Sequence, residues 1–114
     1  MNELLARVKV RLKNTDEPLH DDVLTELLTT AVDQINLRVG DLVLNPLLNS
    51  IAVDLTVKMY RRLYFEGIES EKADTLTITF VDDLLKEYDA ELSAYVRAKK
   101  EDEEDITEYG IKFI

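Results

Sequence analysis

The stretch that decides the fold is NPLLNSIAVDLTVKMYRRLYFEG, residues 45–67. Asn45 is a favourable helix N-cap, and Pro46 suits the first helical position, where no backbone N–H is required. Gly67 is the residue type best able to adopt the left-handed backbone that ends a helix. Between these signals we predict one long helix, residues 45–66, of roughly 30 Å at about 1.5 Å per residue.

The apolar residues of this helix occupy more than one face. One stripe recurs at helical spacing: Leu48, Ile51, Ala52, Leu55, Met59 and Leu63. A second set widens it: Leu47, Val53, Val57, Tyr60 and Tyr64. A helix that is apolar around most of its circumference packs on several sides. We therefore predict a mainly α protein, a small bundle of about four helices around this central helix.

Two shorter helices are predicted before it. Residues 2–13 combine an apolar face with four basic residues, Arg7, Lys9, Arg11 and Lys13. Those cations form either a solvated face, which we favour, or a contact with an acidic surface on a neighbouring chain. A second helix is predicted from His20 to Gly40. The run His20-Asp21-Asp22 is a candidate metal or acid–base site, but helix capping explains it better.

After the central helix, residues 75–80 alternate polar and apolar side chains, which is the period of a strand. Leu76, Ile78 and Phe80 are its apolar positions. Because a lone strand leaves its backbone unpaired, this segment either pairs with another subunit or lies as an extended loop over the bundle. A last helix is predicted from Asp82 to about Lys100, and its apolar face consists of Leu84, Leu85, Tyr88, Leu92, Tyr95 and Val96.

The final residues are predicted to form an extended tail, separate from a single helical domain at residues 1–100. Residues 101–105 are five consecutive acids, which repel one another and indicate a flexible tether. Five large apolar residues follow: Ile106, Tyr109, Ile111, Phe113 and Ile114. We expect these to dock on the bundle or, preferably, on a partner by strand addition.

Composition excludes several classes of protein. The chain has 114 residues, no cysteine and a net charge of −10. Residues 63–114 carry 15 acidic and 6 basic side chains, so most of this charge lies in the second half. Such a field argues against a general nucleic-acid binder. We expect no signal peptide, and no run approaches the ~20 apolar residues that cross a bilayer.

No catalytic constellation is present in the sequence. Three serines, Ser50, Ser70 and Ser93, have a single histidine between them, and no phosphate-binding glycine loop occurs. Glu66, Glu69 and Glu71 lack the pattern of a calcium-binding loop. We therefore expect no enzyme, no cofactor and no metal site.

The chain resembles the head–tail connector family of tailed bacteriophages. The resemblance rests first on YRRLYFEGIESE at residues 60–71, the segment at residues 75–80 and the acidic start DDLL at residues 82–85. The first helix and the second helix, which begins DDVL at residues 21–24 with Ala31 in its middle, resemble the same family. Together these features span about residues 3–98, and the residues after Lys100 lie outside the resemblance.

The resemblance implies a virion structural protein, made in the host bacterial cytoplasm. Copies would form a dodecameric ring beneath the portal and extend the DNA channel, which an acidic wall would keep from sticking to DNA. A stopper or tail-completion protein would attach below. Arg61 and Arg62 would face the acidic part of the next copy, or else remain solvated helix-end charges. With them, Tyr64, the apolar residues of 75–80 and those of the tail are our candidate interface residues.

A second class of function remains open. The acidic half also suits a small regulator, such as a DNA mimic or inhibitor, that binds a basic protein. Self-association separates the two hypotheses, because a mimic acts as a monomer or dimer, whereas a connector forms rings, at least on the portal.

Overall fold

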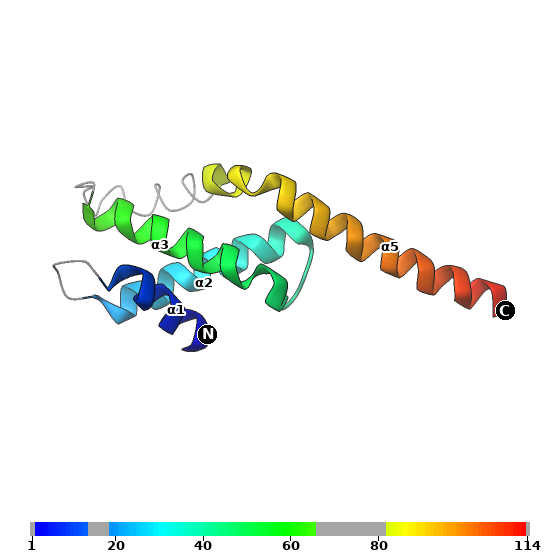
Figure 1. Ribbon diagram of the computed structural model, residues 1–114, viewed down its shortest axis with the longest axis horizontal. Helices are drawn as coiled ribbons and strands as arrows, with labels where there is room; N and C mark the ends of the chain where they lie inside the picture. The colour runs from blue at the N-terminus through cyan, green and yellow to red at the C-terminus, as the bar shows by residue number, and fades with distance from the viewer. Residues whose placement is uncertain (1, 14–18, 66–81, 114) are drawn as a thin grey trace.

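Every secondary-structure element in the described part of the chain is helical (Figure 1). The computed structural model describes residues 2–13, 19–65 and 82–113, with side chains for residues 2–13, 19–63 and 82–101. Its elements are α1 (Asn2–Leu12), α2 (Asp21–Val39), a 3₁₀ turn (Pro46–Leu48), α3 (Asn49–Phe65), a helical segment at residues 82–87, and α5 (Asp89–Phe113). The mainly α prediction is confirmed, while the strand predicted at residues 75–80 lies outside the described residues.

The start of the long helix follows the predicted capping pattern. The Asn45 side-chain Oδ1 accepts a hydrogen bond from the backbone N–H of Leu47 at 2.9 Å, and Pro46 occupies the first helical position. The 3₁₀ turn then leads directly into α3. Asn45 therefore acts as the N-cap that its residue type predicts.

The end of α2 also follows its local signal. Gly40 adopts the left-handed conformation, with φ of 78°, and its N–H donates to the carbonyl of Asn36 at 2.8 Å. The N–H of Asp41 donates to the same carbonyl at 3.0 Å. Glycine satisfies this terminus at no steric cost, so the predicted stop at Gly40 is confirmed.

One apolar core joins the helices. Its buried hydrophobic residues are Leu4, Val8, Leu12, Leu24, Leu27, Leu28, Ala31, Ile35, Val39, Leu48, Ala52, Val53, Leu55, Val57, Met59, Tyr60, Leu84, Leu85 and Leu92. Thr56 is also fully buried, and its hydroxyl is satisfied by the carbonyl of Ala52 at 2.8 Å. Leu47, which was predicted to widen the apolar face, is instead 79% exposed.

The helices do not all pack on α3. Helix α3 packs against α1 and α2, whereas α2 packs against α1, α3 and α5. In Figure 1, α5 crosses the bundle near the α2–α3 connection and then continues beyond it. The Cα radius of gyration is 17.1 Å, compared with the about 13 Å typical of a compact domain of this length. The projecting helix accounts for this elongation.

Two predictions about the last helix require correction. The helix predicted from Asp82 to Lys100 is interrupted at Tyr88, whose N–H donates to the carbonyl of Leu85 at 3.0 Å in a turn. The extended tail predicted after Lys100 is also wrong, because α5 continues to Phe113. Extending a formed helix needs no new nucleus, and the acids at 101–104 follow cations three or four positions earlier, at Arg97, Lys99 and Lys100.

Candidate interaction surfaces

The predicted interface residues fall into three groups. Arg61 is exposed and Arg62 is partly buried, both in the last turns of α3. Tyr64 on α3 and four residues on α5, namely Ile106, Tyr109, Ile111 and Phe113, have helical backbones, but their side chains lie outside the described set. Leu76, Ile78, Phe80 and Ile114 lie outside the described residues altogether. Their interface role therefore stays a prediction.

The basic residues of α1 bind partners within the chain. Arg7 donates to the hydroxyl of Ser50 at 2.9 Å, and Arg11 pairs with Asp54 at 2.9 Å, so both join α1 to α3. Lys9 pairs with Asp21 of α2 at 2.6 Å. These cations bind the first helix to its own bundle. From the sequence we predicted either a solvated face or a contact with a neighbouring chain, and neither interpretation included these contacts.

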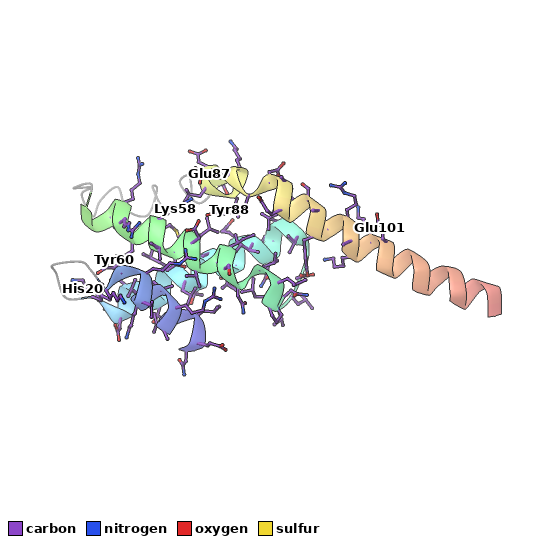
Figure 2. All side chains as sticks on the ribbon, viewed as in Figure 1. His20, Lys58, Tyr60, Glu87, Tyr88 and Glu101 are labelled. Carbon is purple, nitrogen blue, oxygen red and sulfur yellow. The ribbon has the colours of Figure 1, made fainter. Side chains whose placement is uncertain are left out.

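The His20-Asp21-Asp22 run lies at the start of α2, with Asp21 and Asp22 in the first turn, where acids are favoured. The backbone N–H of His20 donates to the hydroxyl of Tyr60 at 3.3 Å, and Figure 2 shows the two residues at the same end of the bundle. His20 occupies the N-cap position, although its side chain makes no capping hydrogen bond. Across the part of the chain that the structure describes, no three His, Asp or Glu side chains converge on a possible metal position.

A polar clamp at the α2–α3 turn holds α5 in place. The carboxylate of Asp41 accepts hydrogen bonds from Lys99 at 2.6 Å and from the Tyr95 hydroxyl at 2.5 Å. Lys99 also donates to the carbonyl of Val39 at 2.9 Å. The hydrogen bonds from Lys99 and Tyr95 lower the pKa of Asp41, and the same bond to Asp41 raises the pKa of Tyr95. We call Asp41, Tyr95 and Lys99 the turn clamp.

A second set of contacts ties the segment around residues 82–88 to α3. The ammonium of Lys58 lies 3.1 Å from a Glu87 carboxylate oxygen, 3.1 Å from the Tyr88 hydroxyl and 3.3 Å from Asp54 (Figure 2). Burial acts to lower the pKa of Lys58, but the hydrogen bonds to Glu87 and Asp54 outweigh it and the pKa is raised. Lys58 therefore stays charged and links the chain on both sides of residues 66–81.

Four exposed apolar residues gather around the α2–α3 connection. Leu42 is fully exposed, Val43 and Leu47 are each 79% exposed, and Leu37 is 76% exposed. We call these four the turn patch. The sequence-based predictions, which place one helix up to Gly40 and the next from residue 45, did not identify this surface. The available signal was the apolar run Leu42-Val43-Leu44 in a turn, where polar residues are usual.

A hollow of about 460 Å³ adjoins the turn patch, and we call it the turn groove. Apolar side chains contribute much of its lining: Leu4, Val32, Leu42, Val43, Leu44 and Pro46. Glu3 and Asp33, both exposed, supply acidic groups. The side-chain Oδ1 of Asn36, another lining residue, is buried and accepts no hydrogen bond within the described residues. The groove thus offers apolar surface, negative charge and one unused acceptor.

Comparison with known proteins gives a family. A family model described as phage gp6-like head-tail connector protein matches residues 2–95. Comparison with curated proteins and with solved structures gave no match. The matched range contains α1, α2, α3 and the first turns of α5, while the projecting part of α5 lies beyond it. Among the described helices, none is both long and apolar enough to cross a bilayer.

Proposed function

The chain belongs to the phage gp6-like head-tail connector family, and from this premise we propose that it forms a ring that docks under the portal and extends the DNA channel toward the tail. The family gives it a structural role in connecting phage head and tail, and a place in the virion. The proposal adds the ring, which we expect to be a dodecamer, the portal contact and the channel.

The observation that carries this proposal is the extent of the family match. It runs from residue 2 to residue 95 and so includes all of the buried core residues. A match of that extent concerns the whole bundle and not one shared helix. The family is structural, and we propose that this chain likewise performs no catalysis.

The distribution of charge supports the channel. Residues 63–114 carry a net charge of −9, whereas residues 1–62 are close to neutral. If the acidic half lines the channel, it repels the DNA phosphates and lets the genome slide without sequence-specific binding. Two of the cations of α1, Lys9 and Arg11, pair with the carboxylates of Asp21 and Asp54 within the chain.

The proposed partners are other copies of the chain, the portal above, and a stopper or tail-completion protein below. We propose that Arg61, Arg62, Tyr64 and residues 75–80 meet one of these partners. Arg61 is exposed in the last turns of α3. Helix α3 ends on the side of the bundle opposite the projecting α5 (Figure 1). A connector with contacts at both ends suits a position between two other components. We propose synthesis in the host cytoplasm before assembly.

The test is negative-stain imaging of the purified protein at high concentration, with its mass measured by light scattering, alone and with the portal protein. We expect rings with a central hole, either in solution or on the portal. Deletion of residues 101–114 is the matched variant: loss of the rings would give the projecting helix a role in assembly. Rings that survive the deletion would keep the function and assign that helix to another partner.

A chain that forms no rings and does not bind the portal contradicts the proposal. Should that chain instead bind basic proteins as a monomer or dimer, the acidic regulator would replace the connector. Portal binding is therefore the decisive measurement when the isolated protein is a monomer.

A further inference from the structure

We propose that the turn groove of one copy binds residues 106–114 of a second copy. This inference rests on the proposed ring-forming function and identifies one of its subunit contacts. It pairs two apolar surfaces of the same chain, one around the α2–α3 turn and one near the end of α5.

The turn groove presents apolar side chains that the isolated chain leaves exposed. Leu42 is fully exposed and Val43 is 79% exposed, beside a hollow of about 460 Å³. Leu4, Val32, Leu44 and Pro46 complete the apolar lining. Contiguous exposed apolar surface beside a hollow is typical of an interaction site. Burying these side chains against another apolar segment would favour association.

The polar groups that line the groove favour a bound segment with a hydrogen-bond donor and a positive charge. Glu3 and Asp33 line the hollow with no salt bridge to either among the described residues. The buried Oδ1 of Asn36 lacks a hydrogen-bond donor within the same residues. A segment that combines apolar side chains with an ammonium group or N–H donors fits these requirements.

Residues 106–114 have that chemistry. On a helical backbone, Ile106, Tyr109 and Phe113 share one face at spacings of three and four residues. Lys112 is the only cation of the segment and lies at the flank of that face. The run of five consecutive acids ends at Asp105, about 10 Å before Lys112 along the helix, and Glu108 is the one acid between that run and Lys112.

The occupant comes from another copy because α5 leads away from its own groove. Helix α5 packs on α2, is held by the turn clamp at Lys99, and continues unbroken to Phe113. Figure 1 shows it leaving the bundle beyond the α2–α3 connection, away from α1, which supplies Glu3 and Leu4 to the groove. A continuous helix does not turn back over that distance. The contact is therefore head-to-tail, the type that closes into rings when the rotation permits.

Chemical cross-linking tests the contact directly, because the chain contains no cysteine. One preparation carries Val43→Cys at the groove, and the other, labelled with ¹⁵N, carries Ile111→Cys in the docking segment. Ile111 is off the face of Ile106, Tyr109 and Phe113, so the new cysteine removes none of those side chains. The two proteins are mixed, treated with a short bis-maleimide, and the mixed dimer is measured by mass spectrometry.

The control pair replaces Val43→Cys with Val10→Cys, since Val10 is also an exposed valine, at 62%, but lies on α1 away from the groove. Docking raises the local concentration of the two thiols, so we expect roughly tenfold more mixed dimer from the Val43 pair than from the Val10 pair. A second set adds Asp33→Lys to the groove protein, which should lower the yield severalfold, and Lys112→Asp to its partner, which should restore it.

The same measurements are made in solution and on protein assembled with the portal. Equal yields from the Val43 and Val10 pairs in both settings would overturn this inference, and rings seen in those samples would leave the proposed function standing. A specific cross-link from the Val43 pair in a protein that forms no rings and binds no portal would support the docking contact and overturn the ring. The two proposals thus fail separately.

Discussion

Asp41 joins the α2–α3 turn to α5. Its carboxylate receives two hydrogen bonds from α5, one from an ammonium and one from a phenol, at the point where α2 ends and the chain turns toward α3. Hydrogen bonds to a charged group contribute more to the stability of the folded protein than hydrogen bonds between neutral groups. The neighbouring pair of Arg38 with Asp89, at 2.8 Å, is more exposed and contributes less.

We predict a pH-dependent loss of stability in the Asp41→Asn variant. Because the pKa of Asp41 is lowered from its ordinary value of 3.8, its ionised form stabilises the folded protein at pH values above 3.8, and this stabilisation is lost as the pH falls through the lowered pKa. At pH 7 the variant should lose roughly 1–2 kcal/mol of unfolding free energy. The difference from the parent protein should shrink below about pH 4.

Urea unfolding at several pH values measures this difference. Asp89→Asn is the matched control, since Asp89 also joins α5 to α2 but its side chain is 66% exposed. We expect the control to change stability by less than about 1 kcal/mol with little dependence on pH. Identical behaviour of the two variants would show that the turn clamp contributes no more than a surface ion pair.

Among the elements, α2 shows how strongly a local signal sets a boundary. Gly40 has a φ of 78° and ends the helix, and no atom lies within 4 Å of the position that a Cβ would occupy. Any side chain placed there therefore meets backbone strain and no collision. The turn that follows carries Asp41 and two residues of the turn patch, Leu42 and Val43, which also line the groove, so the end of α2 also determines where the groove forms.

We predict that Gly40→Ala lowers the unfolding free energy by about 1 kcal/mol, because alanine is strained in the left-handed region. Gly40→Asn should cost less, since asparagine tolerates that conformation. Thermal unfolding followed by circular dichroism orders the three proteins. Equal stability of the alanine variant and the parent would mean that the α2 terminus relaxes to another conformation.

The molecule as a whole is elongated because α5 extends beyond the core. Its principal extents are 61 × 26 × 20 Å. Among the α5 side chains that the structure describes, which end at residue 101, the last buried one is Leu92, and the helix continues to Phe113. Tyr95 and Val96 still pack partly against the core. A segment that leaves its own bundle in this way is available to a neighbouring molecule.

We predict a radius of gyration near 17 Å for the dilute monomer in small-angle X-ray scattering, matching the Cα value of 17.1 Å. A chain whose last residues folded back on the bundle would give about 13 Å, the value for a compact domain of 114 residues. Deletion of residues 101–114 provides the control, because it should lower the radius toward the compact value. No change on deletion would argue against the projecting helix.

Local signals in the sequence were sufficient for the helices of the bundle. The caps at Asn45 and Gly40 were predicted because each depends on the conformational and hydrogen-bonding properties of a single residue type. The apolar face of the last helix was also predicted, and Leu84, Leu85 and Leu92 are buried as expected. Helical periodicity predicts which residues share a face without knowledge of what that face contacts.

Tertiary structure decided what those faces meet. The partners of Arg7, Lys9 and Arg11 lie 12 to 43 positions away in sequence. The sequence near these residues therefore does not reveal that they bind the first helix to its own bundle. Leu47 has the spacing of a core residue but lies exposed in the turn patch, within the 3₁₀ turn that precedes α3. The acidic run after Lys100 suggested a frayed tail, yet it continues a helix already anchored by Tyr95 and Lys99.

The sequence by itself determined where helices begin and end and which of their faces are apolar, because those properties depend on neighbours within a few residues. The exposed groove and the projecting α5 were decided by the tertiary structure, because they arise only when distant helices pack and leave surfaces uncovered.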